Sequence, residues 1–401
     1  MSREPAAPAA SSGAAPERLL LINHEYPPIG GGAGNATENL ARELAALGVG
    51  VRVITARHGD LPGRETTAEG VEIIRIPALR RRRDRSSILE MLSFLASSLA
   101  YVPLHAARWR PSATLAFFGL PAGPSAWLAR WVSGAPYIVS LRGGDVPGFQ
   151  YSGIGVYHRL TGPVIGFLWR RAAAVVANSE GLADLARRFA PDIAIALIPN
   201  GVDAGRFVPA PVSASGEAMR LVIVGRLVHQ KGIDSLLTAM ARAGVPLTLE
   251  IVGDGEARAE LEAQAAALGL AGRVTFTGWL DRAHLPAVYA GADLFVFPSR
   301  DEGMPNVVLE AMAAGLPVIG SDIAGNRDLI VPEETGLIVP VDDPDALARA
   351  LARLQGDPAR RRLMGAAGRA RVETLFSWRE AARRYCALAS GMCAAADAAR
   401  D

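Results

Sequence analysis

The sequence predicts an α/β protein in which two doubly wound, Rossmann-like domains follow one another and face each other across a cleft. Three observations predict this fold class. The chain has 401 residues, and at about 150 residues per domain this length fits two large domains or three small ones. Short apolar runs, typical of buried parallel strands, alternate with helical segments. The alternation starts near residue 18, is interrupted near residue 205 and resumes near residue 219.

The composition indicates a folded protein with a large core and excludes several other classes. Hydrophobic residues make up 50% and charged residues 20% of the chain, which excludes an intrinsically disordered protein. The net charge of +2 is too small for a general nucleic-acid coat protein. Cys386 and Cys393 are the only cysteines, so a disulfide scaffold and a cysteine-rich metal site are excluded. We therefore expect a reducing, cytoplasmic location.

The first domain is predicted over residues 17–204. Residues 1–16 are rich in Ala, Pro and Ser and lack a signal-peptide pattern, so we expect a disordered tail there. A glycine-rich turn follows the first strand and leads into an amphipathic helix over Asn35–Leu47. The predicted strands of this domain are Arg18–Asn23, Val51–Thr55, Val71–Ile76, Thr114–Phe118, Tyr137–Leu141, Ala174–Ala177 and Ile193–Ile198.

A linker rich in Pro, Gly and Ser is predicted over residues 205–217, and the second domain over residues 218–375. Residues 376–392 are expected to form a last helix, and residues 393–401 a disordered tail. The predicted strands are Leu221–Val224, Leu247–Val252, Val274–Thr277, Leu294–Phe297, Pro317–Gly320 and Gly336–Val339. Ligands of such sheets bind beyond the carboxyl ends of the strands, so we expect the site in the cleft between the domains.

Two carboxylates follow the predicted strand Leu294–Phe297. The segment reads Ser299-Arg-Asp-Glu-Gly-Met-Pro-Asn-Val-Val-Leu-Glu310. Glu302 falls in the loop and Glu310 in the next helix, so the pair can accept hydrogen bonds from two sets of hydroxyls on one polyol ligand. Gly303 permits close backbone approach, and free amides at the helix start can receive an anion. The alternative is that Glu302 only stabilises the helix N-terminus and that Glu310 is a surface residue.

Two cations lie in the loop after the first strand of the second domain, Val224-Gly-Arg-Leu-Val-His-Gln-Lys-Gly232. Arg226 offers a bidentate fork and Lys231 a compact charge, and both suit a pyrophosphate. Lys231 is the only lysine among 42 basic residues, which favours a functional ammonium. The alternative is a surface turn with two solvated cations. The order of residues in a P-loop is absent.

A glycine-rich loop, Tyr26-Pro-Pro-Ile-Gly-Gly-Gly-Ala-Gly34, follows the first strand of the first domain. Turns of this kind between a strand and a helix let a phosphate or a sugar approach the backbone. The dinucleotide fingerprint is not met, because Asn35 stands where its last glycine would fall. A plain tight turn is the alternative.

These motifs, with Ile198-Pro-Asn-Gly-Val-Asp203 before the linker, resemble glycosyltransferase family 4, which has the GT-B fold. The resemblance covers roughly residues 18–390. It implies a retaining transfer of a sugar from a nucleotide diphosphate-sugar, without a metal or another cofactor. It also implies that the C-terminal helix crosses back onto the first domain.

The resemblance implies roles for single residues. Arg226 and Lys231 would hold the donor pyrophosphate, Glu302 would bind hydroxyls of the transferred sugar, and Glu310 would bind the ribose. The first three are the predicted catalytic residues. The other predicted donor-binding residues are Gly31 and Gly32, which would face the phosphates or the acceptor, Gly278, which would line the base, and Gly303, Met304, Pro305 and Asn306 at the start of the helix.

One element departs from the family, which often has His-Gly-x-Asp/Glu after the fifth strand of the first domain. This chain has Leu141-Arg-Gly-Gly-Asp-Val146, so Arg142 stands at the histidine position. A guanidinium cannot act as a general base, but it can bind an anionic acceptor or donor group. Asp145 and His24, at the end of the first strand, are the other candidates on the acceptor side. A structural turn is the alternative for Asp145.

No metal site is predicted, because the histidines lack metal-ligand spacing. Asp343-Pro-Asp345 fits a helix cap better than a metal site. Arg80–Arg85 holds a basic cluster that precedes Ile88–His105, a stretch too short and too polar to span a bilayer. Such a cluster before an amphipathic helix suits peripheral contact with an anionic inner-membrane surface. The alternative is a solvated charge run before a helix packed on its domain.

The sequence thus predicts a retaining hexosyltransferase of cell-envelope or polysaccharide synthesis. The predicted partners are a UDP- or GDP-sugar donor and a glycan, lipid-linked or small-molecule acceptor, with no nucleic acid. A nucleotide-sugar epimerase of the same fold is one alternative, and incubating the donor without an acceptor would reveal it. A non-catalytic sugar-nucleotide-binding protein is the other, and it would bind donors without forming a product.

Overall fold

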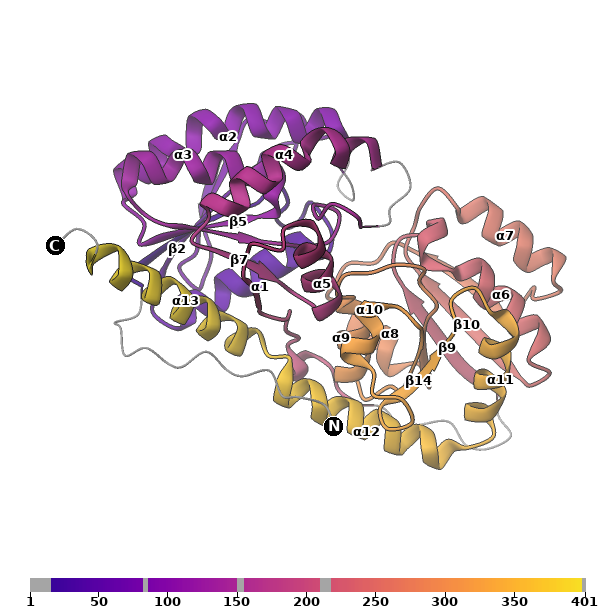
Figure 1. Ribbon diagram of the computed structural model, residues 1–401. Helices are drawn as coiled ribbons and strands as arrows, with labels where there is room; N and C mark the ends of the chain where they lie inside the picture. The colour runs from indigo at the N-terminus through magenta and orange to yellow at the C-terminus, as the bar shows by residue number, and fades with distance from the viewer. Residues whose placement is uncertain (1–15, 82–85, 150–154, 210–217, 399–401) are drawn as a thin grey trace.

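The computed structural model describes residues 16–81, 86–149, 155–209 and 218–398, and it has two lobes (Figure 1). The first lobe is built on an eight-stranded sheet with the strand order β3-β4-β2-β1-β5-β6-β7-β8, in which only β3 is antiparallel to its neighbour. Its strands are β1 (Arg18–Ile22), β2 (Gly50–Ala56), β3 (Arg64–Thr66), β4 (Glu72–Ile76), β5 (Ala113–Phe117), β6 (Tyr137–Ser140), β7 (Ala174–Ala177) and β8 (Ile195–Leu197).

Helices cover both faces of this sheet, which explains why its strands are apolar on both sides. Leu20, Leu21 and Ile22 in β1 are fully buried. One face packs against α2 to α5, and the other against α1 and α13. The helices of this lobe are α1 (Gly32–Ala46), α2 (Ile88–Trp109), α3 (Gly123–Ser133), α4 (Gly155–Arg171) and α5 (Glu180–Phe189).

The second lobe has a parallel six-stranded sheet with the order β11-β10-β9-β12-β13-β14. Its strands are β9 (Met219–Val224), β10 (Leu247–Val252), β11 (Val274–Gly278), β12 (Leu294–Phe297), β13 (Val318–Ser321) and β14 (Gly336–Val339). Its helices are α6 (Ile233–Arg242), α7 (Arg258–Ala267), α8 (Leu285–Ala290), α9 (Asn306–Ala313), α10 (Ala324–Leu329), α11 (Pro344–Gln355) and α12 (Pro358–Leu375). The strand order is that of a Rossmann fold.

The strand order places the functional loops. In the second sheet the direction of winding reverses between β9 and β12, and in the first sheet it reverses between β1 and β5. Ligands of doubly wound sheets bind at these reversal points, beyond the carboxyl ends of the strands. The loops after β1, β9 and β12 hold the three motifs found in the sequence. The fold therefore brings the motifs to one cleft, and it confirms the predicted fold class.

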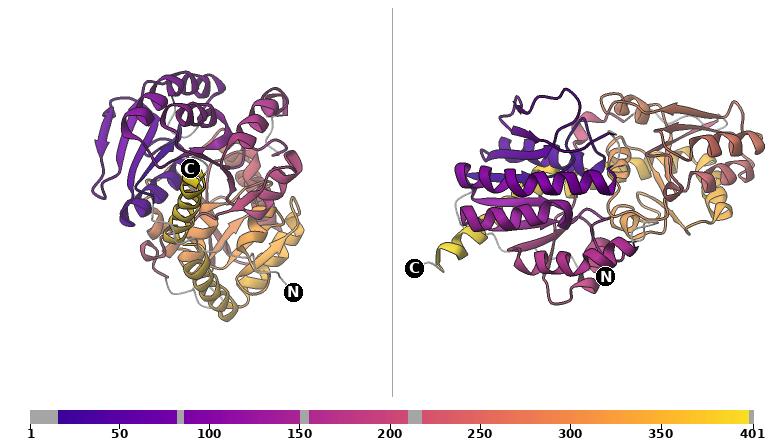
Figure 2. Two further views of the ribbon diagram at one scale, coloured as in Figure 1. Left: turned by 60° about the vertical axis from the view of Figure 1, so that its left-hand side comes forward. Right: turned by 90° about the horizontal axis from the view of Figure 1, so that it is seen from above.

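The last helix, α13 (Trp378–Ala398), crosses back and packs on α1 of the first lobe (Figure 2). Trp378 and Tyr385 are buried in a shared core, and the Tyr385 hydroxyl lies 2.8 Å from Ser140 Oγ. The chain passes between the lobes twice, and the two passages lie next to each other. The Val202 amide on the first donates to the Phe376 carbonyl on the second at 2.8 Å. The helix extends to Ala398, so the tail predicted from residue 393 was placed six residues too early.

Three other sequence expectations need correction or completion. The strand β3 was not predicted, because Arg64–Thr66 is short and polar. The helix α10, over Ala324–Leu329, was also not predicted, because it has only six residues. At the start of the predicted linker, residues 204–206 form a 3-10 turn, and Phe207 is buried. The predicted tail at residues 1–15 and the linker residues 210–217 lie outside the described residues.

Trp378 should contribute strongly to stability, because its side chain joins the crossing helix to the first lobe. We expect Trp378→Ala to lower the free energy of unfolding by about 3–5 kcal/mol, the usual cost of removing a buried aromatic side chain. Chemical denaturation followed by circular dichroism measures this loss. Trp131→Ala is the matched control, because Trp131 is 72% exposed. Equal losses in the two variants would contradict the assigned role of Trp378.

Candidate active site

An ion pair links the loops after β9 and β12. Lys231 Nζ lies 2.5 Å from Glu302 Oε1 and 5.0 Å above the centre of the Phe297 ring. The Lys231 and Glu302 side chains are 14% and 17% exposed, so neither is a free surface group. Ser299 Oγ lies 3.2 Å from Glu302 Oε1 and 3.0 Å from the carbonyl oxygen of Gln230. The only lysine of the chain is therefore held in place beside the predicted sugar-binding carboxylate.

Arg226 differs from Lys231 in its surroundings. It is exposed, and its guanidinium makes no hydrogen bond or ion pair with any residue that the structure describes. Gly225, directly before it, has a φ of +158°, and a Cβ there would lie 3.4 Å from Lys231 Cε. The glycine thus lets the lysine chain lie against the backbone. Arg226 is available to a ligand at the edge of the site.

The start of α9 meets the first lobe. The Asn200 side chain donates from Nδ2 to Asn306 Oδ1 at 2.8 Å, and Asn306 Nδ2 donates to the Gly32 carbonyl at 3.4 Å. The Asn200 amide donates to Met304 Sδ at 3.2 Å. Pro305 precedes α9, and no side chain caps the helix, so its first amides are not satisfied by a cap. These contacts place the predicted anion-binding amides beside the glycine-rich loop.

Gly303, Gly31 and Gly32 differ in how much space surrounds them. A Cβ on Gly303 would lie 3.7 Å from the Arg142 carbonyl oxygen of the first lobe. A Cβ on Gly32 would lie 3.5 Å from Asn306 Nδ2, whereas a Cβ on Gly31 would meet open space. Gly31 and Gly32 are exposed. The geometry therefore leaves room for a ligand beside Gly31.

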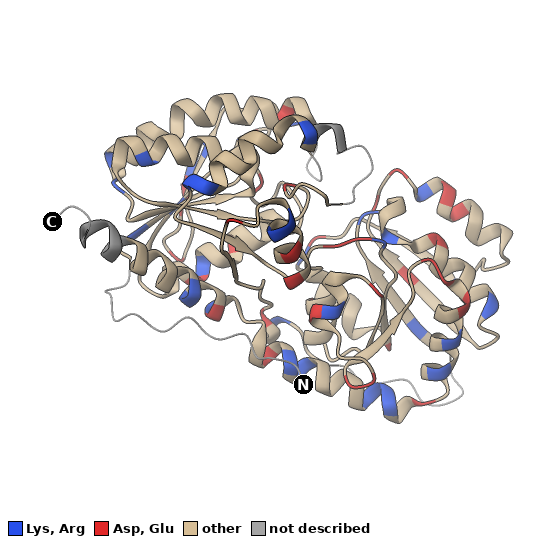
Figure 3. Ribbon diagram, viewed as in Figure 1, with Lys and Arg blue, Asp and Glu red and all other residues tan. Residues whose placement is uncertain are grey.

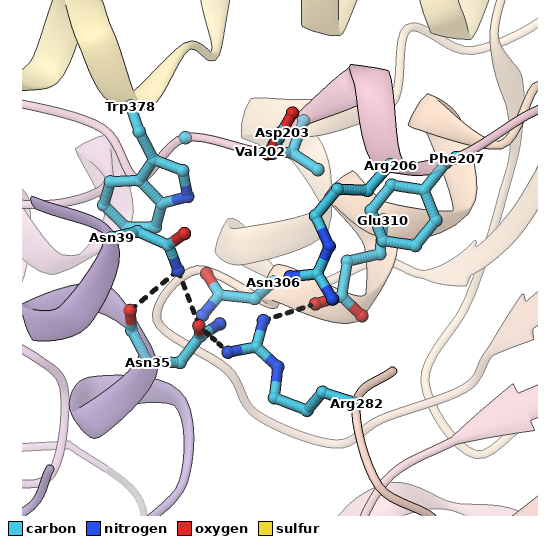
Figure 4. A pocket seen from close by; sticks show the side chains of 11 residues that line it. Asn35, Asn39, Val202, Asp203, Arg206, Phe207, Arg282, Asn306, Glu310 and Trp378 are labelled. Atoms are coloured by element: carbon cyan, nitrogen blue, oxygen red, sulfur yellow. Dashed lines mark hydrogen bonds and ion pairs between the residues drawn. The ribbon is translucent and has the colours of Figure 1, made fainter. Parts of the chain in front are cut away.

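Glu310 forms a second polar cluster one helical turn into α9 (Figure 4). Its Oε2 accepts from the Tyr289 hydroxyl at 3.0 Å, and its Oε1 accepts from Arg282 Nη2 at 3.4 Å. Arg282 also hydrogen-bonds to Asn35 Oδ1 of α1, so it bridges the two lobes. Burial raises the pKa of Glu310, and the Arg282 guanidinium opposes this shift. A buried carboxylate with one cation partner suits the binding of hydroxyls.

This cluster lines a small, solvent-open pocket between the lobes. Figure 4 shows side chains from α1, α9 and both crossings around it. The lining residues are Asn35, Asn39, Gly201, Val202, Asp203, Arg206, Phe207, Arg282, Asn306, Glu310 and Trp378. Asn306 is common to the pocket and to the contact with Gly32. The pocket and the start of α9, where anion binding is predicted, are therefore parts of one interdomain site.

Arg142 and Asp145 are placed differently from a pair of ligand-binding groups. The Asp145 carboxylate is buried and accepts from the amides of Gly119 at 3.0 Å, Arg142 at 3.0 Å and Gly143 at 3.1 Å. Burial raises the pKa of Asp145, and these hydrogen bonds oppose the shift. Both oxygens thus fasten the loops after β5 and β6. This geometry favours the structural alternative for Asp145.

The Arg142 guanidinium is directed toward the junction of the lobes. Its Nη1 donates to Asn200 Oδ1 at 2.6 Å, and the group lies 4.5 Å above the centre of the Phe117 ring. The buried Nε makes no hydrogen bond to the described residues, and burial lowers the pKa of Arg142. Arg142 therefore belongs to the hydrogen-bonded chain that continues through Asn200 to Asn306 and Gly32.

The remaining two candidates, His24 and Gly278, lie at the ends of other strands than the Lys231–Glu302 ion pair. His24 is buried between the rings of Phe94 and Phe118, its Nδ1 has no partner among the described residues, and burial lowers its pKa. Gly278 ends β11, with a φ of +81°, and is separated from β9 by β10. His24 is therefore packed within the first lobe, and Gly278 lies on the edge strand of the second sheet.

Asn35, Asn200, Arg282 and Tyr289 were missed from the sequence. Each of them contacts a residue that is distant in the sequence, and no local motif encodes such a contact. Arg282 lies in the loop that follows β11, and Tyr289 lies in α8 after that loop. The only feature of the sequence that could have indicated them is their position beyond the end of a predicted strand. Asn200 was quoted within Ile198–Asp203 but received no role. Among the described residues no group of three or more His, Cys, Asp or Glu could hold a metal ion, and Asp343 caps α11.

The chain matches two families of known proteins. Residues 210–371 match "Glycosyl transferases group 1", and residues 31–201 match "Glycosyl transferase 4-like domain". A 2-deoxystreptamine glucosyltransferase of Streptomyces kanamyceticus is 32% identical, over 80% of this chain and 88% of that protein.

Two further similarities differ in their coverage. A GDP-mannose-dependent alpha-(1-6)-phosphatidylinositol monomannoside mannosyltransferase of Mycolicibacterium smegmatis is 36% identical, over 51% of this chain. The match spans 59% of that relative's length. The solved structure of sucrose-phosphate synthase from Thermosynechococcus elongatus superimposes with a TM-score of 0.84 at 27% identity, over 94% of this chain and 100% of the other.

Proposed function

Given that this chain belongs to the group 1 glycosyl transferases and has their GT-B fold, we propose that it moves a hexose from a nucleotide diphosphate-sugar to a sugar-containing or lipid-linked acceptor with retention of configuration. The Lys231–Glu302 ion pair carries the proposal, because it lies where the winding of the second sheet reverses. The same point faces the uncapped start of α9 and the glycine-rich loop of the other lobe.

The proposed roles follow from charge and reach. An ammonium has three hydrogen-bond donors, so Lys231 can hold Glu302 with one and the donor diphosphate with the others. Arg226 would close on the same diphosphate, because it is exposed and unpaired among the described residues. Amides at the start of α9 would add uncharged donors. Glu302 would hold hydroxyls of the sugar, and Glu310 hydroxyls of the ribose.

In the proposed reaction the bond from the anomeric carbon to the diphosphate oxygen breaks, and a bond to the acceptor oxygen forms. The acceptor proton leaves with the nucleoside diphosphate, on which negative charge develops. Arg226, Lys231 and the α9 amides would stabilise that charge, and such charge-assisted hydrogen bonds contribute roughly 1.5–3 kcal/mol each. Closure of the lobes would exclude water and limit hydrolysis of the donor. We propose that no metal ion is needed, so a chelator should leave the turnover unchanged.

A thermal-shift panel tests the donor. We expect a UDP- or GDP-hexose to raise the melting temperature, because a ligand that binds only the native state stabilises it. Arg226→Ala should reduce the shift, whereas Arg349→Ala should not, since Arg349 is exposed on α11, away from the cleft. No shift with any nucleotide sugar would contradict the proposal. Incubating the bound donor without an acceptor then separates transfer from epimerisation.

For the location we propose the cytoplasmic face of a membrane, with contact through Arg80–Arg85 and α2. The structure reduces the support for contact through the basic cluster Arg80–Arg85. The Arg80 side chain is 2% exposed and its Nη2 lies 3.9 Å from Glu25 Oε1, so Arg80 is turned inward. Arg81 is exposed, and residues 82–85 lie outside the described part of the chain. Support for membrane contact therefore comes mainly from the helix that follows.

A further inference from the structure

The outer layer of the first lobe is unusually apolar. The helices α2, α3 and α4 cover one face of the first sheet and lie together (Figures 1 and 2). Of the seventeen large hydrophobic side chains that are exposed in the described part of the chain, eleven lie on these three helices. They are Ile88, Leu89, Leu92, Leu99, Tyr101 and Leu104 on α2, Trp131 and Val132 on α3, and Leu160, Val164 and Phe167 on α4. Exposed apolar patches of this size mark interaction sites.

Contacts between aromatic rings join the second and third helices of this layer. Trp127 of α3 lies with its ring centre 5.5 Å from that of Phe167 of α4 and 6.3 Å from that of Trp131. Trp131 is 72% exposed and Leu160 on α4 is 75% exposed. We call the surface made by the eleven side chains the α2–α4 face. Tryptophan and tyrosine on such a face favour the interface between water and lipid.

The α2–α4 face carries no accessible carboxylate. Between Glu90 and Glu180 the sequence has one acidic residue, Asp145. Glu90 and Asp145 are both buried, Glu90 in the capping box of α2 and Asp145 beneath the loop amides. Five exposed arginines lie on these helices, namely Arg108, Arg130, Arg159, Arg170 and Arg171, and Arg170 pairs with the exposed Asp192 that follows α5. Figure 3 shows the three helices almost free of acidic colour. A surface on which cations outnumber anions is attracted to anionic headgroups.

The packing of α2 argues against a membrane-spanning helix. The helix has 22 residues and contains an 18-residue window with a mean hydropathy of 1.3, so by length and composition alone it is a candidate span, contrary to the expectation from the sequence. However, Phe94, Val102 and Ala106 are buried in the core against the first sheet. Withdrawing α2 from this layer would expose that core to solvent. Only the outer side of the helix is free to meet lipid.

The charges also argue against a second copy of the chain on this face. Two copies meeting through the α2–α4 face would bring arginines together without compensating carboxylates, and like charges opposed in an interface are costly. We propose that the α2–α4 face docks on the surface of an anionic lipid bilayer. This deepens the proposed function, on which it rests, because a docked enzyme would receive its acceptor from the lipid surface.

Sedimentation with vesicles tests the docking without any measurement of activity. We expect the full chain to sediment with vesicles of phosphatidylglycerol and phosphatidylcholine, and more weakly with phosphatidylcholine alone. The triple variant Leu89→Glu, Trp131→Glu, Leu160→Glu changes one side chain on each helix, and all three are more than 70% exposed. It should lose binding to the anionic vesicles by about tenfold or more. Leu363→Glu on α12, at a side chain that is 73% exposed, is the matched control and should bind normally.

Three results would overturn the docking proposal. They are no sedimentation of the unmodified chain with anionic vesicles, equal binding by the triple variant, or a dimer that the triple variant dissociates in sedimentation velocity. The melting-temperature rise with the nucleotide sugar, measured without vesicles, should be the same in the triple variant and the unmodified chain. Because this second readout concerns only the cleft, a failure of docking and a failure of the proposed transferase function are distinguishable.

Discussion

Replacing Lys231 with alanine should lower kcat by about 10²–10³-fold, the effect of removing one preorganised donor from a developing negative charge. Lys231 Nζ is one of two cations in the loop after β9, and it alone is fixed by contacts, to Glu302 at 2.5 Å and over the Phe297 ring. A fixed cation requires little reorganisation when the diphosphate leaves. Steady-state transfer to a suitable acceptor, with the donor saturating, measures the change.

The Lys231 prediction needs a test that separates chemistry from folding. The melting temperature of Lys231→Ala without ligand should fall, because the largely buried Glu302 carboxylate loses its cation partner, so circular dichroism should first show that the variant is folded at the assay temperature. The rise in melting temperature with nucleoside diphosphate should shrink. Lys231→Arg should restore little activity, since Gly225 and Phe297 confine the side chain. Near-normal transfer by a folded Lys231→Ala variant would remove Lys231 from the proposed mechanism.

The positions of the strands along the chain were predictable, because the hydrophobic pattern that marks a strand is local. Leu294–Phe297 is apolar throughout, as a strand covered on both faces must be, and it matches β12 to the residue. Leu247–Val252 is interrupted by Thr248 and Glu250 but is otherwise apolar, and it matches β10 to the residue. β3 escaped prediction because an edge strand of three residues with two charges buries little. The end of α13 was misjudged because alanine-rich sequence suits both a helix and a loose tail.

The second-lobe half of the site was predictable for a different reason. Arg226, Lys231, Glu302 and Glu310 lie on two short segments, each following a strand at the reversal point of one sheet. What sequence could not supply is how the first lobe meets them. Asn35, Asn200 and Arg282 act only after the two lobes are brought together, and neither spacing nor composition encodes that contact. The roles proposed for individual residues stay predictions until variants are assayed.

Replacing Arg282 with alanine should reduce kcat/KM for the donor by roughly 10- to 150-fold, and the loss should grow as the pH falls. Arg282 forms an ion pair with Glu310, on which Arg206 also acts electrostatically, and it hydrogen-bonds to Asn35 of the other lobe. Losing a charge-assisted hydrogen bond costs about 1.5–3 kcal/mol, which corresponds to that range. Initial rates at limiting donor measure the loss. Arg349→Ala, on an exposed part of α11 away from the cleft, is the control.

The sign of the pH dependence follows from the surroundings of Glu310. Burial raises the pKa of Glu310 and Arg282 lowers it, so removing the guanidinium must raise that pKa further. A protonated carboxyl accepts ribose hydroxyls more weakly than a carboxylate, so the variant loses affinity at a pH where the unmodified chain still binds. Tyr289→Phe should shift the profile the same way and by less, because the Tyr289 hydroxyl also lowers the Glu310 pKa. A loss that is constant from acid to neutral pH would mean that Arg282 acts only by joining the lobes.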